Sequence, residues 1–145
     1  MDFSKGLRIS SSGLTAQRMR MNTISSNIAN INTTSTPEGG PYRRKDVVFE
    51  SMPETRNFGE ILKSEPDRNL ERVQVTDVHV DRGAPLLKYE PNHPDANENG
   101  YVAYPNINLM EEMANMIQAT RSYEANVSAM QATKDMTAAA LEIGR

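Results

Sequence analysis

The two ends of this 145-residue chain carry matching heptad repeats of apolar residues, separated by a long polar stretch. Apolar side chains that recur in steps of three and four residues share one face of an α-helix, and a sustained heptad is typical of helices that pack against other helices. We therefore predict a mainly α fold with a small β-rich insert. Long N- and C-terminal helices would pair as a coiled-coil-like layer around a central region of β-hairpin and loop.

The N-terminal repeat predicts a helix over residues 3–32, ended by Asn30, Asn32 and the threonine-rich segment before Pro37, because proline excludes the α-region for the residue that precedes it. Gly6, Gly13 and the serines at 10–12 weaken its first half, so we expect little helix in the dilute monomer. The residues of this repeat that we predict to form an assembly interface are Phe3, Leu7, Leu14, Met21, Ile24, Ile28 and Ile31.

The C-terminal repeat predicts a helix that starts at Asn108, a good N-cap with Glu111 three residues later, and ends near Ile143. The corresponding predicted interface residues are Leu109, Met113, Met116, Tyr123, Val127, Met130 and Leu141. Alternating and turn-flanked segments predict strands over residues 42–49, 73–80, 86–90 and 101–104, with a short helix possible near 58–63. We expect three parts: the N-terminal helix (1–33), the insert (34–105) and the C-terminal helix (106–145).

The repeats have an alternative explanation, which is a self-contained helical hairpin. Two observations favour packing against several partners instead. Polar residues such as Gln17 and Lys134 occupy stripe positions, and apolar residues such as Met110 and Ile117 lie off them. The composition agrees, since only 37% of residues are hydrophobic and the mean hydropathy is −0.63, low for a domain that must close its own core.

Nothing in the sequence indicates catalysis, a metal or a cofactor. The chain has no cysteine, and neither His79 nor His93 has further ligands at metal spacing. Residues 95–100 match the start of an EF-hand loop, but Asn106 stands at the twelfth position, where a glutamate is required, so we expect a polar turn. We predict a protein that is not an enzyme.

The charge distribution and the hydropathy of the chain argue against nucleic acid and a lipid bilayer as partners. Residues 1–32 carry four basic residues against one acidic, a net of +3, whereas residues 106–145 carry five acidic against three basic, a net of −2. Basic residues are nowhere interleaved with aromatics as a nucleic-acid surface requires, so we expect no nucleic acid. No apolar run approaches 18 residues and the first residues lack an apolar core, so we expect neither a membrane span nor a cleaved signal peptide.

Several segments together make the chain recognisable. Residues 11–18 and 22–33, Gly-Gly-Pro-Tyr-Arg-Arg-Lys at 39–45, His-Pro-Asp-Ala-Asn at 93–97 with Gly-Tyr-Val at 100–102, and Arg-Ser-Tyr-Glu-Ala-Asn-Val at 121–127 are the clearest. In these segments the chain resembles the flagellar axial proteins of bacteria, and among them those of the proximal rod. Only residues 51–72 carry no motif of this kind.

The resemblance implies a structural subunit of the rod, the driveshaft that crosses the periplasm. In that family the terminal helices pair and line the inner tube of a helical assembly, and export uses the flagellar type III apparatus. The implied neighbours are copies of the chain itself, other rod proteins, the junction protein FliE and the rod cap. Phe3 with Leu7, and Phe58 with Leu62, fit the short Phe-x-x-x-apolar pattern attributed to early export substrates, although core packing explains Phe3 and Leu7 equally well.

Two other classes of function remain open at this point. An export chaperone or assembly accessory would also expose helical stripes, but would be a folded cytoplasmic dimer absent from finished flagella. A secreted filament outside flagella is disfavoured by the segments at 39–45 and 93–97.

Overall fold

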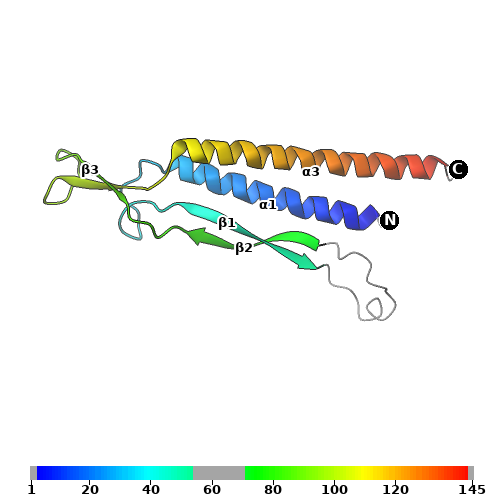
Figure 1. The fold of residues 1–145 in the computed structure, drawn as a ribbon, viewed down its shortest axis with the longest axis horizontal. Helices are drawn as coiled ribbons and strands as arrows, with labels where there is room; N and C mark the ends of the chain where they lie inside the picture. Colours follow the sequence, from blue (N-terminus) through cyan, green and yellow to red (C-terminus); the bar gives the residue numbers. More distant parts are fainter. Residues whose placement is uncertain (1–2, 54–70, 144–145) are drawn as a thin grey trace. The chain divides into compact units, whose positions relative to one another are not determined.

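The computed structural model describes residues 3–53 and 71–143. A long helix stands at each end of the chain and four strands lie between them in sequence (Figure 1). The elements are α1 (Phe3–Ala29), β1 (Lys45–Pro53), β2 (Glu71–Val80), β3 (Leu86–Tyr89), β4 (Tyr101–Tyr104) and α3 (Leu109–Ile143). The predicted fold class, mainly α with a small β-rich insert, is confirmed. The short helix considered near 58–63 falls outside the described residues.

The chain divides into two compact units, and each helix runs through both. The terminal unit comprises Met1–Arg18, Val48–Asp77 and Thr120–Arg145, and the central unit comprises Met19–Val47 and Val78–Ala119. The buried apolar side chains of the described residues are distributed unequally. Ala16 is buried in the terminal unit, whereas the central unit buries Ile24, Val47, Val102, Ile107 and Ala119. The central unit therefore has a small core of its own.

Helix α1 ends three residues earlier than predicted, at Ala29 rather than residue 32. The Asn30 amide donates back to the Ser26 carbonyl at 2.9 Å, and the Thr33 N–H donates to the Asn30 carbonyl at 3.1 Å. These contacts replace the next helical turn with a tighter one, because asparagine competes well for backbone groups at a helix end. Ile31, predicted to extend the helical stripe, therefore lies in the turn that follows α1.

The strands form two separate two-stranded sheets, β1 with β2 and β3 with β4. Strand β1 starts at Lys45, later than the predicted residue 42, and the Arg44 carbonyl accepts the Asp81 N–H at 2.8 Å. In the antiparallel β3–β4 hairpin, Leu87 stands opposite Ala103, and Tyr89 stands opposite Tyr101. Residues directly opposite one another project from the same face of a sheet, so these four side chains share one face.

The loop between β3 and β4 is held by Asn97 and Gly100. The Asn97 side-chain oxygen accepts the N–H groups of Asn99 and Tyr101 at 3.0 and 2.9 Å. Gly100 has a φ of +79°, the left-handed region that glycine occupies without strain. The expected polar turn is present here, with backbone geometry as the reason for its Asn and Gly residues.

Gly100→Ala is expected to destabilise the chain by about 1–3 kcal/mol, because alanine at positive φ is strained. The added Cβ would also come within 2.8 Å of Tyr89 Cε2. Urea unfolding followed by circular dichroism measures the loss. In a Tyr89→Ala background the clash disappears and the backbone strain remains, so the loss should shrink without vanishing. An equal unfolding midpoint for Gly100→Ala and the parent chain would contradict this account.

Helix α3 begins as predicted, because the Asn108 side-chain oxygen accepts the Met110 N–H at 3.1 Å and so caps the first turn. In the terminal unit the two helices approach closely at Gly13, where an added Cβ would lie 3.1 Å from the Asn126 side chain. The Ser12 hydroxyl also accepts the Val73 N–H of β2 at 3.2 Å.

Among the described residues, no helix is both long and apolar enough to cross a membrane.

Candidate functional site

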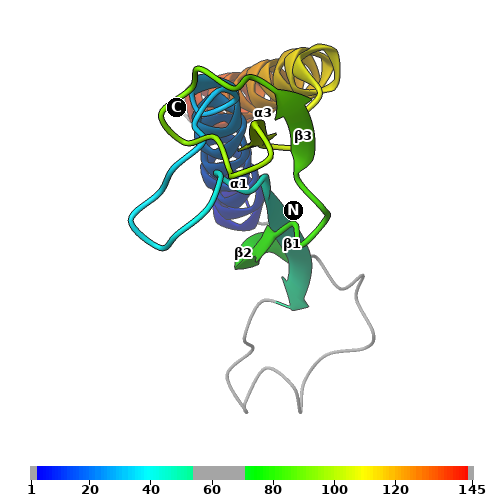
Figure 2. The same cartoon turned by 90° about the vertical axis from the view of Figure 1, so that its left-hand side faces the viewer.

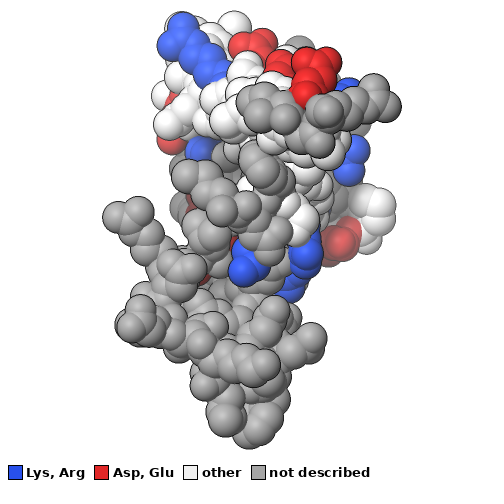
Figure 3. Space-filling view, turned by 90° about the vertical axis from the view of Figure 1, so that its right-hand side faces the viewer, with Lys and Arg blue, Asp and Glu red and all other residues white. Residues whose placement is uncertain are grey.

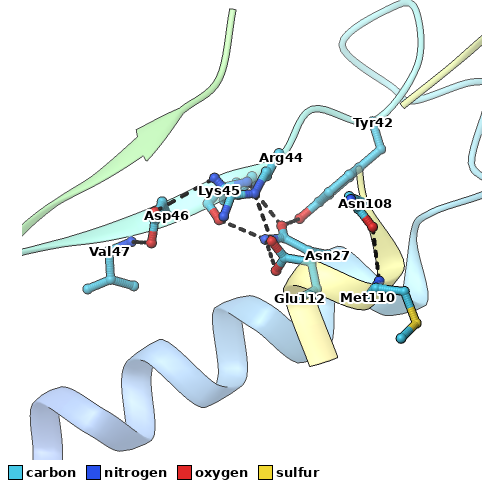
Figure 4. Close-up of polar contacts among 9 residues, drawn as sticks. All are labelled: Asn27, Tyr42, Arg44, Lys45, Asp46, Val47, Asn108, Met110 and Glu112. Atoms are coloured by element: carbon cyan, nitrogen blue, oxygen red, sulfur yellow. Dashed lines mark hydrogen bonds and ion pairs between the residues drawn. The ribbon is translucent and has the colours of Figure 1, made fainter. Parts of the chain in front are cut away.

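The most enclosed polar side chain of the central unit is Asn27, which is 0% exposed (Figure 4). Its amide nitrogen donates to the Lys45 carbonyl at 2.8 Å and to Glu112 Oε2 at 3.0 Å. Its oxygen accepts the Lys45 N–H at 3.0 Å and the Tyr42 hydroxyl at 3.1 Å. An asparagine side chain offers two donors and two acceptor sites, so every one of them is used.

Glu112 is the second buried member of this cluster, with 1% of its surface exposed. Its other oxygen, Oε1, lies 2.7 Å from Arg44 Nε. Desolvation by burial acts to lower the pKa of Arg44, but the hydrogen bond and the charge of Glu112 more than offset it and raise that pKa above its ordinary value. The carboxylate is thus matched by a guanidinium that stays charged under all ordinary conditions.

We name Asn27, Tyr42, Arg44 and Glu112 the polar cluster. It joins the last turns of α1, the segment just before β1 and the first turn of α3 within the central unit. A buried polar network whose members are all paired fixes a single arrangement of the elements that carry it, because any shift would leave a donor or acceptor unpaired. The cluster therefore has a structural role: it holds these elements together, and its polar groups are hydrogen-bonded to one another.

Sequence reasoning missed this cluster. From the sequence alone Arg44 had no assigned partner, and the acidic residue singled out in the first turn of α3 was Glu111, three residues after the N-cap Asn108, rather than Glu112. The acidic partner of Arg44 is in fact in the same chain. A usable signal existed, since Asn27 lies three residues after Ile24, on the same helix face, and is polar there.

The structure places the predicted N-terminal interface residues on a face that the chain itself partly covers. Ile24 is buried at 4% exposure, and Leu7, Leu14, Met21 and Ile28 are partly buried. Ile31 is partly buried in the turn after the helix, and the side chain of Phe3 lies outside the described residues.

The predicted C-terminal interface residues separate into two groups. Met116, Tyr123, Val127 and Met130 are partly buried. The exposed group contains Leu109, Met113 and Leu141, at 42%, 48% and 72%. Residues that lie off the predicted stripe are exposed as well, namely Met110 at 72%, Ile117 at 55% and Met136 at 56%.

Helix α3 is therefore apolar on more than the side that its own chain covers. In the central unit, Leu109, Met113 and Ile117 follow each other in steps of four, so they form one row along the helix, and Met110 flanks it. We call these four residues the α3 outer row. A helix that is apolar on more than one side normally has more than one packing partner.

The side of the molecule that lies on the right in Figure 1 carries charged groups of both signs. On the face shown in Figure 3, Lys and Arg side chains and Asp and Glu side chains are both present among uncharged residues. Within the described residues, no group of three or more histidine, aspartate or glutamate side chains is arranged to hold a metal ion. The features that remain to be explained are the exposed apolar faces.

The chain is similar in sequence to known proteins over nearly its whole length. The family described as "Flagella basal body rod protein" matches residues 7–35, and "Flagellar basal body rod FlgEFG protein C-terminal" matches residues 98–143. The chain is 41% identical to the flagellar basal-body rod protein FlgC of Borreliella burgdorferi, covering 99% of this chain and 98% of the relative. It is 45% identical to FlgC of Bacillus subtilis, covering 96% of each, and 37% identical to FlgC of Escherichia coli, covering 94% of each.

Proposed function

Because this chain belongs to the FlgC family of flagellar basal-body rod proteins, and is a structural subunit rather than an enzyme, we propose that it joins the rod through the apolar helix faces that its own fold leaves uncovered. Its place in the basal body and its assembly with other rod components follow from the family. The proposal concerns which surfaces make those contacts.

The observation that carries the proposal is the exposure of large apolar side chains along α3. Leu109, Met110, Met113, Ile117, Met136 and Leu141 are each between 42% and 72% exposed. Burying a side chain of this size contributes about 1.5–3 kcal/mol, so packing several of them against neighbours would strongly favour assembly. Methionine suits such a surface because its flexible side chain adapts to neighbours of different shape.

The full set of residues that we propose for assembly spans both helices. On α1 and the turn after it, the set is Phe3, Leu7, Leu14, Met21, Ile24, Ile28 and Ile31. On α3 it is Leu109, Met113, Met116, Tyr123, Val127, Met130 and Leu141. The partly buried members would act by holding the two helices together, and the exposed members would contact the neighbouring subunits.

The unequal distribution of buried residues supports a coupling between assembly and helix order. The terminal unit buries Ala16 alone among its described apolar side chains, so its described helical residues have less of the packing that usually stabilises helices than those of the central unit. We propose that this unit becomes stably ordered only in the rod, whereas the central unit keeps its structure in the monomer.

Hydrogen exchange of the dilute monomer tests this coupling. Amides of α1 and α3 in the central unit, residues 19–29 and 112–119, should be protected. Amides of the same helices in the terminal unit, residues 6–18 and 120–140, should exchange close to the rate of an unfolded chain, because local opening there breaks few buried contacts. Uniform protection along both helices would contradict the coupling.

We also propose that the chain reaches the rod through the flagellar type III apparatus, lies in the periplasmic part of the basal body, and has the junction protein FliE and the rod cap among its neighbours. Phe3 and Leu7 are the candidate export motif, and the alternative pair, Phe58 and Leu62, falls outside the described residues. Export assays on Phe3→Ala and on Phe58→Ala, read as the amount of chain leaving the cytoplasm, would separate the two. If neither change lowered export, neither segment would be the signal.

Mass spectrometry of hook–basal bodies purified from the source bacterium tests the proposal as a whole. We expect this chain in amounts comparable to those of other rod proteins. If it were confined to the cytoplasm, its proposed place in the assembled rod would be wrong.

A further inference from the structure

The β3–β4 hairpin exposes an apolar face that neither the fold nor the helix stripes account for. Leu87, Tyr89, Tyr101 and Ala103 share this face, as the strand register requires. Leu87 is 66% exposed, Tyr89 63% and Tyr101 44%, and the two tyrosine rings meet edge to face with centroids 5.4 Å apart. We call these four residues the hairpin face.

The opposite face of the same hairpin is only partly covered, since Leu86 and Lys88 on it are exposed. There Val102 is 0% exposed, and Lys88 forms an ion pair with Glu90, which also accepts the Tyr104 hydroxyl at 2.9 Å. The hairpin thus turns one side toward its own unit and leaves the other, uncharged and aromatic, uncovered. An exposed cluster of large apolar side chains is typical of a surface that contacts another protein.

The central unit carries a second uncovered surface of complementary chemistry, the α3 outer row. Figure 2 shows the molecule from the side on which both the β3–β4 hairpin and the start of α3 lie. The row presents the thioethers of Met110 and Met113 beside Leu109 and Ile117. Methionine sulfur packs favourably against aromatic rings, and the hairpin face offers two of them.

We propose that the hairpin face of one copy of this chain packs on the α3 outer row of the next copy in the rod. A head-to-tail contact between two different surfaces of the same subunit generates a helical filament when it does not close into a ring. It would cover both uncovered surfaces of every internal copy. A symmetric contact of hairpin with hairpin would leave the α3 outer row exposed, so a second copy docked head to tail fits the observations best. The inference rests on the proposed function, since it requires that copies of this chain meet in the rod.

Cross-linking between introduced cysteines tests the contact. The chain has no cysteine of its own, so each variant carries a thiol at one chosen position only. Two epitope-tagged copies are co-expressed in the source bacterium in place of the native chain, one carrying Leu87→Cys and the other Met113→Cys. Both positions are exposed, at 66% and 48%, so the substitutions should leave the fold intact. Intact basal bodies are then treated with a short bifunctional maleimide. Since each copy holds one thiol, a product of dimer mass that carries both tags must join residue 87 of one copy to residue 113 of another.

Matched controls come from the neighbouring residues. Leu86, 54% exposed, projects from the opposite face of β3, and Gln118, also exposed, lies about 140° around the helix from Met113. The pairs Leu86→Cys with Met113→Cys, and Leu87→Cys with Gln118→Cys, should give several-fold less of the doubly tagged product than the pair at 87 and 113.

Each outcome decides the inference. A strong product for the pair at 87 and 113 alone supports it. Equal yields for all three pairs, or a product that joins residue 87 to a different rod protein, would overturn it. So would the lack of a product in motile cells whose basal bodies contain both copies, and that result would leave the proposed function standing. Absence of the unsubstituted chain from basal bodies would overturn both proposals.

Discussion

Glu112→Ala is expected to lower the free energy of unfolding by about 3–5 kcal/mol, the cost of removing one partner of a buried ion pair. Arg44 would lose the carboxylate 2.7 Å from its Nε, and the Asn27 amide would lose an acceptor at 3.0 Å. Since domains are stable by only about 5–15 kcal/mol, a large share of the central unit's stability would disappear. Urea unfolding followed by circular dichroism measures the loss, and motility should fall with it.

The adjacent residue supplies the control for this prediction. Glu111 is exposed and lies in the first turn of α3, so Glu111→Ala should lower stability by no more than about 1 kcal/mol, the contribution of an acidic side chain near a helix N-terminus. Replacing both partners, as in Arg44→Met with Glu112→Leu, should restore much of the lost stability, because an apolar pair leaves no unpaired buried charge. If Glu112→Ala and Glu111→Ala had equal effects, the polar cluster would not have the structural role assigned to it.

Leu109→Asp is expected to abolish motility while the protein remains expressed and the central unit of the monomer remains folded. Leu109 is 42% exposed, so in the monomer the new carboxylate can stay in water, and stability should change by no more than about 1 kcal/mol. In the rod the same carboxylate would be buried against a neighbour without a partner, at an effective cost of several kcal/mol at every subunit contact. Swimming assays and the amount of chain in purified basal bodies are the measurements.

Gln118→Asp provides the comparison, because it introduces the same charge at an exposed position of α3 on the side of the helix opposite Leu109. Motility should survive this change. A motile Leu109→Asp strain with normal basal bodies would show that the α3 outer row is not an assembly surface. Loss of motility in both strains would mean that any added charge on α3 is harmful, and the row would have no special role.

Much of the secondary structure could be predicted from the sequence because its determinants are local. The heptads predicted both helices, Asn108 marked the start of α3, and the paired strands β3 and β4 lie where short apolar runs flank turn residues. The end of α1 was misplaced by three residues because proline at 37 gives only an outer limit. Asn30 was among the residues expected to end the helix, but its side-chain contact with Ser26, which marks where the helix stops, is not visible in the sequence.

By itself the sequence determined the two long helices, the small β-rich insert and the family, since helical periodicity, capping residues and family motifs are all properties of neighbouring residues. Only the tertiary structure decided which side of each helix is covered and which acid pairs with Arg44. Residues 44 and 112 are 68 positions apart, and residues 27 and 112 are 85 apart. A heptad pattern shows that a face is apolar, but not what packs on it. Burial and pairing across such separations depend on how the whole chain folds back on itself, so the polar cluster, the hairpin face and the α3 outer row became visible only in three dimensions.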